Sequence, residues 1–217
     1  MSDKDQRIDS YLGSLSRGNG TFLDELEHTA KAEDIPIIRP SVRNLLKVMI
    51  KAINPKAILE VGTATGFSAI LMAQCMPDDC TITTIEKYEK RIPVAKENFK
   101  KAGYDDRITL LEGDAADILK DLKGNKYGLI FMDAAKGQYL NFFDDVMSLL
   151  EEGGVLISDN VLQEGDILES RYAVCRRDRT IHSRMREYLF VLTHDERLET
   201  VILPVDDGVS VSVKYGE

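Results

Sequence analysis

The sequence has 217 residues and a formal net charge of −9 at pH 7. Hydrophobic residues at 43% and charged residues at 30% are typical of a packed globule and exclude a disordered chain. Three cysteines without metal-ligand spacing exclude a disulfide framework, and no apolar run reaches the ~20 residues that cross a bilayer. We therefore expect one domain over residues 1–217, located in the cytoplasm and without a membrane partner.

The N-terminal part of the chain is expected to be helical. Residues 3–33 carry apolar stripes with helical spacing, interrupted at Gly18–Gly20. A further helix is expected over Val42–Ile53, with Ser41 as its N-terminal cap. Residues 1–33 carry no chemical signature, so we expect this segment to cover the substrate entrance or to form the interface of a homodimer.

From residue 57 onward, short strands alternate with helices, which predicts right-handed βαβ units and a parallel sheet. Two strands joined by a short turn close the chain, and this hairpin places one antiparallel strand in the sheet. The expected strands are Ala57–Val61, Thr81–Ile85, Ile108–Glu112, Gly128–Met132, Gly154–Ser158, Glu199–Pro204 and Gly208–Lys214. The expected helices between them are Ser68–Met76, Tyr88–Ala102, Ala115–Leu122 and Gln138–Leu150.

The first expected strand ends in a glycine turn that leads into a helix. Glycine allows a tight turn and a close approach of the backbone to a ligand. The spacing from Gly62 to Gly66 is G-x-x-x-G, which differs from the G-x-G-x-x-G of dinucleotide-binding folds. The next two strands end in Glu86 and in Gly113-Asp114. A carboxylate at the second strand end can bind both hydroxyls of a ribose. Alternatively, Glu86 is a surface residue and Asp114 a helix cap.

Carboxylates also follow the fourth and fifth strands. Asp133 and Lys136 follow one strand, and Asp159 and Asn160 follow the next. Because ligands bind at the carboxyl ends of parallel strands, we expect two carboxylates and one carboxamide to converge there. Such oxygen ligands suit Mg²⁺ or another hard divalent cation, and a lysine beside them can act as a general base. Alternatively, the aspartates are separate helix caps and Lys136 only pairs with one of them.

An arginine-rich segment contrasts with the acidic chain. Residues 171–186 contain six arginines against one acid, Asp178. Such a cluster is a candidate site for an anionic partner, or else a solvated helix face paired with neighbouring acids. The helix that carries it is expected to end near His194, so residues 171–195 form a helical insertion. The arginines are Arg171, Arg176, Arg177, Arg179, Arg184 and Arg186.

Taken together, these strand ends resemble the motifs of cation-dependent class I O-methyltransferases of the caffeoyl-coenzyme A and catechol type. The resembling segments are Ile58–Ser68, Glu86, Met132–Lys136 and Ser158–Asn160. The resemblance implies a Rossmann-like, seven-stranded and mostly parallel sheet with helices on both faces. It covers roughly residues 35 to 215.

The resemblance also implies the ligands and their residues. S-adenosylmethionine is expected at the first strand ends, Mg²⁺ on Asp133, Asp159 and Asn160, and Lys136 is expected to act as the base beside Asp133. The residues assigned to the methyl-donor site are Ile38, Glu60, Gly62, Ser68, Glu86, Gly113, Asp114, Ala115 and Asp133.

Within that family, residues 171–186 resemble the bacterial branch that methylates 5-hydroxyuridine to 5-methoxyuridine in the anticodon loop of tRNA. This implies tRNA as a partner, and members of the family commonly form homodimers. A cation with two open positions favours a substrate with two neighbouring oxygens, which 5-hydroxyuracil and catechols both provide. Arginine holds phosphates through forked hydrogen bonds and stacks on bases. The residues assigned to RNA binding are Arg171, Arg176, Arg177, Arg179 and Arg184.

Two other functions stay open. One is an enzyme of the catechol or caffeoyl-coenzyme A type that acts on a small phenol, for which the arginine cluster has no evident use. The other is an NAD-dependent oxidoreductase or an inactive nucleotide-binding module, which the glycine spacing and the converging metal-ligand residues disfavour.

Overall fold

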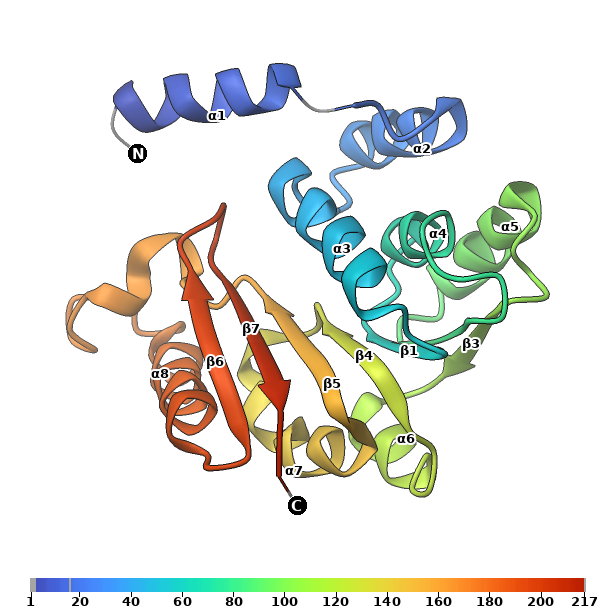
Figure 1. Ribbon diagram of the computed structural model, residues 1–217. Helices are drawn as coiled ribbons and strands as arrows, with labels where there is room; N and C mark the ends of the chain where they lie inside the picture. The colour runs from blue at the N-terminus through green and yellow to red at the C-terminus, as the bar shows by residue number, and fades with distance from the viewer. Residues whose placement is uncertain (1–2, 16, 217) are drawn as a thin grey trace.

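The computed structural model describes residues 3–15 and 17–216 and contains one seven-stranded sheet. The strand order is β3-β2-β1-β4-β5-β7-β6, and β7 runs antiparallel to both of its neighbours while the other six strands are parallel (Figure 1). The expected Rossmann-like α/β fold is thereby confirmed. The strands are β1 (Ala57–Val61), β2 (Thr81–Glu86), β3 (Ile108–Glu112), β4 (Tyr127–Met132), β5 (Leu150–Asp159), β6 (Leu198–Leu203) and β7 (Val209–Lys214).

Helices cover both faces of this sheet. Apolar side chains of α3, α4 and α5 form one core with one face, and those of α6, α7 and α8 form a second core with the other face. The helices are α1 (Asp3–Leu15), α2 (Thr21–Ala32), α3 (Pro40–Ile53), α4 (Phe67–Ala73), α5 (Ile92–Ala102), α6 (Ala115–Asp121), α7 (Tyr139–Leu149) and α8 (Arg179–His194), with 3₁₀ turns η1 (Lys136–Gln138) and η2 (Gln163–Leu168).

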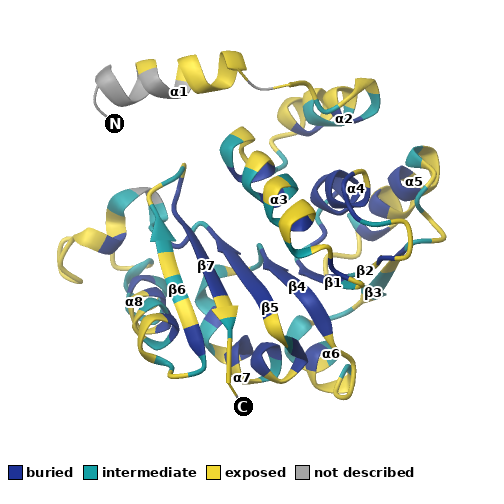
Figure 2. Ribbon diagram, viewed as in Figure 1, coloured by how far each residue is buried: buried dark blue, intermediate teal, exposed yellow. Residues whose placement is uncertain are grey.

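The central strands are apolar on both sides because both of their faces are covered. In β1, Ile58 belongs to one core and Leu59 to the other, and both are fully buried. In β4, Phe131 and Met132 are divided between the two cores in the same way. Figure 2 shows the buried residues concentrated in these central strands. Such continuous apolar runs are typical of parallel strands that lie between two helical layers.

Several element boundaries differ from those expected: β5 begins at Leu150 rather than at Gly154, α4 ends at Ala73 rather than at Met76, and two helix starts depend on proline. α3 begins at Pro40 with Arg39 as its N-cap, so Ser41 is not the cap. Proline suits this first helical position because it lacks the N–H that would be unpaired there. α5 begins at Ile92, since Tyr88 and Arg91 form a turn closed by a backbone hydrogen bond of 2.8 Å. In both cases a proline in the first helical turn sets the boundary.

The β6–β7 hairpin brings the end of the chain back to the tip of β5. Its turn contains Gly208 at φ +82°, where a Cβ would overlap the side chain of Leu162. The backbone of the turn accepts hydrogen bonds from Val161 and Leu162 at 3.0 and 2.9 Å. These contacts place Asp207 beside the residues that follow β5.

The two N-terminal helices differ in how they contact the rest of the protein. Leu23 of α2 is completely buried in the core of the α3–α5 face, whereas Tyr11, Leu12 and Leu15 of α1 are exposed. A covering or dimer-forming role of residues 1–33 stays a prediction, and residues 1, 2 and 16 lie outside the described chain. Within the described chain, no helix has the length and apolar character needed to span a membrane.

Candidate active site

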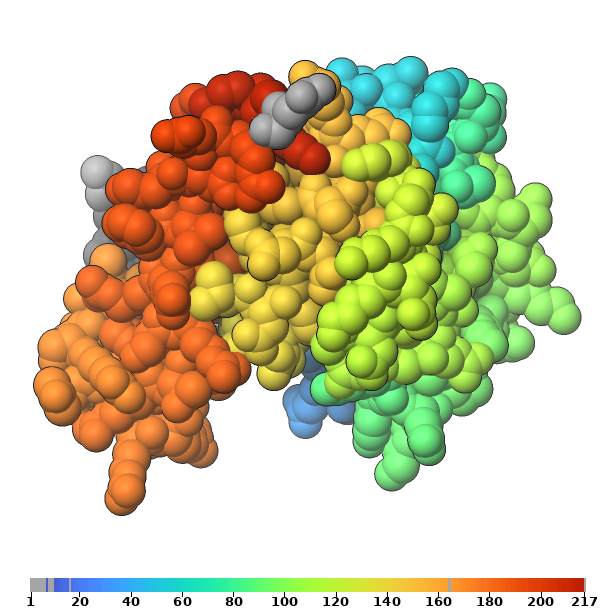
Figure 3. Space-filling model, turned by 90° about the horizontal axis from the view of Figure 1, so that it is seen from below, coloured from blue at the N-terminus to red at the C-terminus, as the bar shows by residue number. Residues whose placement is uncertain are grey.

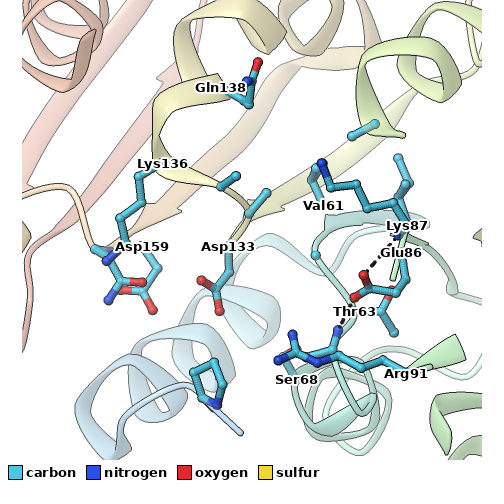
Figure 4. Close-up of a pocket in the computed structure, with 18 of the residues that line it drawn as sticks. Val61, Thr63, Ser68, Glu86, Lys87, Arg91, Asp133, Lys136, Gln138 and Asp159 are labelled. Atoms are coloured by element: carbon cyan, nitrogen blue, oxygen red, sulfur yellow. Dashed lines mark hydrogen bonds between the residues drawn. The ribbon is translucent and has the colours of Figure 1, made fainter. Parts of the chain in front are cut away.

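A cavity of about 770 Å³ lies at the carboxyl ends of β1, β2, β4 and β5. Most of the residues predicted for the two ligands line it, and Figure 4 shows several of them facing the same space. The predicted residues that line the cavity are Ile38, Gly62, Ser68, Glu86, Gly113, Asp114, Ala115, Asp133, Lys136, Asp159 and Asn160.

The glycine turn after β1 brings backbone close to the end of β4. Gly62 has φ +110°, and a Cβ at this position would overlap the carbonyl of Asp133. Asp133 also donates its backbone N–H to the carbonyl of Val61 at 3.0 Å. A residue with a side chain could adopt neither this conformation nor this approach. Gly62 therefore lets the turn after β1 lie directly against Asp133 at the end of β4, so that the two strand ends form one continuous wall of the cavity.

Glu86 lies at the tip of β2, where a ribose-binding carboxylate was predicted. Its Oε2 accepts a hydrogen bond from the Ala64 N–H at 2.8 Å, and its Oε1 accepts from the N–H groups of Lys87 and Tyr88. These bonds fix the carboxylate between the glycine turn and the start of the next segment (Figure 4). A carboxylate has about four acceptor positions, so one stays available for a ligand hydroxyl.

Asp133 and Asp159 are both held inside the cavity wall at the ends of adjacent strands. The hydroxyl of Tyr139 is 3.1 Å from the carbonyls of Met132 and Asp159, which joins the two strand ends. Burial raises the pKa of Asp133 to about 6, although Lys136 opposes the shift. Burial and the nearby charge of Asp133 raise the pKa of Asp159 to about 7. The two carboxylates therefore destabilise each other's charged form.

Lys136 extends from η1 toward the same space and contacts an acid that the sequence did not predict. Its Nζ lies 3.3 Å from the carboxylate of Asp207, which is only 4% exposed. The sequence motif predicted Lys136 in the pocket, whereas Asp207 was assigned to a hairpin turn. No local signal connects the two, because the contact depends on the pairing of β7 with β5.

Glu60 differs from its predicted role, because it is completely buried below the cavity and does not line it. Its Oε2 accepts a hydrogen bond from the Thr84 hydroxyl, which is in turn 2.6 Å from the Thr63 hydroxyl. Burial raises the pKa of Glu60 to about 8. Since Thr63 lines the cavity, this chain of hydroxyls connects Glu60 to the cavity wall.

The predicted RNA-binding arginines fall into two groups. Arg171, Arg176 and Arg177 are exposed. Arg179 instead donates to the carbonyls of Val174 and Tyr172, and Arg184 donates to the Gly137 carbonyl at 2.9 Å. The segment before α8 lies at the same end of the sheet as the cavity (Figure 1) and projects as a lobe in the space-filling view (Figure 3).

Sequence reasoning missed several residues that line the cavity. Arg39 and Pro36 come from the segment between α2 and α3, and Arg91 follows β2. Phe142 comes from α7. None of these belongs to a strand-end motif. Their side chains could be assigned to the cavity only once the packing of the helices was known.

Comparisons with known proteins are consistent with this geometry. A model of the O-methyltransferase family matches residues 14–215. A caffeoyl-CoA O-methyltransferase from Medicago sativa is 35% identical over 176 residues, covering 76% of this chain and 70% of that protein. A catechol O-methyltransferase from Mycobacterium tuberculosis is 31% identical over 163 residues and covers 74% of each chain. The crystal structure of an SAH-bound methyltransferase from Podospora anserina is 27% identical, covers 100% of this chain and 97% of that chain, and has a TM-score of 0.87.

The sheet order and the strand-end cavity define a Rossmann-like methyltransferase. The chain belongs to the O-methyltransferase family and is an S-adenosylmethionine-dependent O-methyltransferase. This result excludes the NAD-dependent oxidoreductase considered from the sequence.

The residues present fit both implied ligands. The close backbone approach at Gly62 and the fixed carboxylate of Glu86 suit a nucleoside-containing methyl donor. Two carboxylates at adjacent strand ends, the buried Asp159 and the partly exposed Asp133, suit a hard divalent cation together with the carboxamide beside them. Among the described residues, no group of three or more Asp, Glu, His or Cys side chains forms a metal site, so the candidate set depends on the Asn160 oxygen as third ligand.

Proposed function

We propose that this enzyme methylates a hydroxyl that neighbours a second oxygen on its substrate, and that it requires a divalent cation. The substrate that we propose is 5-hydroxyuridine in the anticodon loop of tRNA, which becomes 5-methoxyuridine. The observation that carries the proposal is the convergence of Asp133, Asp159 and Lys136 on one cavity that also contains the donor-site residues.

The divalent cation would be held by Asp133, Asp159 and Asn160. When bound, it lowers the pKa of a coordinated hydroxyl and orients the substrate beside the methyl group of S-adenosylmethionine. The raised pKa values of the two carboxylates support this role, because burial disfavours their charged forms and a bound cation would compensate that charge.

Residues of the chain supply the remaining chemistry. Lys136 would accept the proton of the substrate hydroxyl as a neutral amine, the form that a cation bound beside it favours, and its contact with Asp207 keeps its Nζ at the cavity. Glu86 orients the ribose of the methyl donor, and the Gly62 turn lets the donor approach the Asp133 side. Phe142 and Ile38 line the cavity with apolar surface and exclude water from part of it.

Support for tRNA as the substrate comes from the arginines beside the cavity. Arg171, Arg176 and Arg177 are exposed on the segment that leads into α8, at the same end of the sheet as the cavity. Exposed arginines bind phosphates, and an unpaired base can turn into a neighbouring pocket. Because the chain as a whole carries a net charge of −9, this local cationic segment is the contact that we assign to RNA.

A small phenol is the second candidate substrate. It is favoured by the names of the relatives, which act on caffeoyl-CoA and on catechol. The same cation and base would serve a catechol, since it also presents neighbouring oxygens. The arginine-bearing segment would then have no role in substrate binding.

Mass spectrometry of tRNA nucleosides from cells that lack the protein distinguishes the two substrates. We expect 5-methoxyuridine to disappear and 5-hydroxyuridine to accumulate, and a plasmid-borne copy to reverse both changes. A copy with Asp159→Asn should express normally without reversing them. Unchanged tRNA nucleosides, together with efficient methylation of dihydroxyphenols by the purified enzyme, would favour the small-phenol function.

A further inference from the structure

A second cavity of about 410 Å³ lies apart from the active site, between the end of η2 and the first turns of α8. His182 joins the two walls, since its Nε2 donates to the carbonyl of Glu169 at 3.1 Å and its side chain is almost completely buried. We call this cavity the α8 groove. Its lining residues are Glu169, Ser170, Arg171, His182, Ser183 and Arg186.

The hydrogen-bond donors of the α8 groove are mostly available to a ligand. Arg171 is exposed and has no hydrogen-bond or ion-pair partner within the described chain. Arg186 uses one N–H for the Ile167 carbonyl at 3.0 Å, and a guanidinium has five. The oxygen of the Ser170 hydroxyl accepts from a backbone N–H, which leaves its proton free to donate. Two guanidinium groups against one carboxylate, Glu169, give the groove a net positive charge.

The α8 groove is connected to the active site through α8 itself. Arg184, one residue after Ser183, donates to the carbonyl of Gly137 at 2.9 Å, and Gly137 follows Lys136 directly. The side chain of Ile181 also lies against Gly137, 3.6 Å from the position of a Cβ there. The first turns of α8 therefore contact the Lys136 loop on one side and line the groove on another.

We propose that the α8 groove binds a phosphate group of the RNA whose base occupies the active site. Paired arginines with serine hydroxyls are the donors that hold phosphate oxygens in forked hydrogen bonds. This inference rests on the proposed tRNA substrate and sharpens it. It assigns the phosphate contact to Arg171 and Arg186, which line the groove, rather than to Arg179 and Arg184, which do not line it.

Binding of inorganic phosphate tests the α8 groove without any assumption about the methylated substrate. NMR of the full-length protein follows the ring signals of His182, which lies in the groove wall. We expect a saturable shift on phosphate addition that Arg171→Gln abolishes. Because Arg171 has no partner to lose, this variant should fold normally. No saturable shift, or the same shift in Arg171→Gln, would overturn the proposal.

Kinetics with two substrates then test whether the phosphate belongs to RNA. One substrate is an anticodon stem-loop with 5-hydroxyuridine, and the other is the 5-hydroxyuridine nucleoside, which has no phosphate. We expect Arg171→Gln with Arg186→Gln to raise KM for the stem-loop about tenfold, with unchanged kcat and unchanged KM for the nucleoside. The salt slope of stem-loop binding should fall by about one. Lys100→Gln with Lys101→Gln removes the same charge from α5, which lies beside β3 at the opposite edge of the sheet from α8, and is the matched control.

The outcomes separate the inference from the proposed function. If Arg171→Gln with Arg186→Gln has the same KM for the stem-loop as the α5 control, the groove is not an RNA-binding site. If the unmodified enzyme methylates neither the stem-loop nor the nucleoside, the result would instead contradict the tRNA function. Coenzyme A also carries phosphates, so its addition distinguishes the two sources of phosphate. Displacement of the stem-loop by coenzyme A at lower concentration than by inorganic phosphate would assign the groove to a thioester substrate and overturn the RNA proposal.

Discussion

The Lys136 ammonium lies 3.3 Å from the carboxylate of Asp207, a residue 71 positions further along the chain. The lysine side chain is about one third exposed, and this ion pair holds the proposed base at the cavity. We expect Asp207→Asn to lower kcat about tenfold while the affinity for S-adenosylmethionine stays unchanged, because positioning of the base is lost and the donor site is not touched. Steady-state kinetics together with calorimetric binding of the methyl donor measure the two effects.

The neighbouring Asp206 gives a matched control for this prediction. It is exposed and has φ +51°, a conformation that asparagine also accepts. Asp206→Asn removes the same charge from the same turn and should leave kcat close to that of the unmodified enzyme. Equal losses in the two variants would show that the charge of the turn matters rather than the contact with Lys136.

Arg43 fixes the segment that closes one side of the cavity. Its Nε donates to the carbonyl of Ile38 at 2.7 Å, an Nη donates to Glu27 at 2.5 Å, and its guanidinium lies 4.7 Å from the centroid of the Phe67 ring. We expect Arg43→Met to lower the free energy of unfolding by about 2–4 kcal/mol, because it removes a buried guanidinium and leaves the Ile38 carbonyl without its donor and Glu27 with only the exposed Lys31 as partner. It should also weaken binding of S-adenosylmethionine, since Ile38 and Phe67 line the cavity.

Lys31 is the control for the Arg43 prediction, because it is the second partner of Glu27 but is 69% exposed. Lys31→Met should change the free energy of unfolding by less than about 1 kcal/mol. Urea denaturation and calorimetry compare the variants. Arg43 holds the pKa of Glu27 at about 2, so its stabilising effect should be present above pH 4.5 and be lost as the pH falls toward 2. Equal unfolding energies for Arg43→Met and Lys31→Met would contradict the proposed role of Arg43.

Cation affinity should depend on pH through the two strand-end carboxylates. Burial raises the pKa of Asp133 to about 6, and burial together with the charge of Asp133 raises that of Asp159 to about 7. A cation must displace these protons, so its affinity should be highest above pH 7 and should fall as the pH drops below 6. Electron paramagnetic resonance with Mn²⁺ measures the affinity directly. A dissociation constant that does not change across this interval would contradict the assignment of the ligands.

The buried carboxyl of Glu60 makes stability depend on pH in the opposite direction from that of Glu27. Burial raises its pKa from 4.5 to about 8 in the folded protein. The unfolded chain therefore releases this proton first as the pH rises, and the free energy of unfolding should fall between pH 4.5 and 8. We expect Glu60→Gln to reduce this loss, which is on the order of a few kcal/mol. Urea denaturation near both limits measures it, and parallel curves for the two proteins would refute the prediction.

Much of the fold could be predicted because its strands and helices have distinct periods. The strand starting at Ala57 was predicted with both of its observed boundaries, and the antiparallel hairpin was predicted from the turn before Gly208. Boundaries that depend on proline were less accurate, since Pro40 begins a helix for which Ser41 was the expected cap. The polar strand-end residues identified the cavity because parallel strands bring their carboxyl ends to one edge of the sheet.

The remaining site residues depend on tertiary packing. Asp207 reaches Lys136 only because β7 pairs with β5, and a hairpin turn carries no sequence signal of that contact. Glu60 was assigned to the methyl-donor site by the family resemblance. Side chains alternate along a strand, and at this position the alternation directs the carboxyl into the protein interior below the cavity. Some arginines of residues 171–186 donate to backbone carbonyls and others do not. Only the structure distinguishes the two groups.

The most direct test of cation-dependent methylation is a single-turnover assay with an anticodon stem-loop that carries 5-hydroxyuridine. Enzyme treated with EDTA and loaded with S-adenosylmethionine is mixed with the stem-loop, and Mg²⁺ is then added back. We predict no methylated product before the addition and full turnover after it, with no recovery in Asp159→Asn although that variant binds the methyl donor normally. Methylation at an undiminished rate in EDTA would contradict the account.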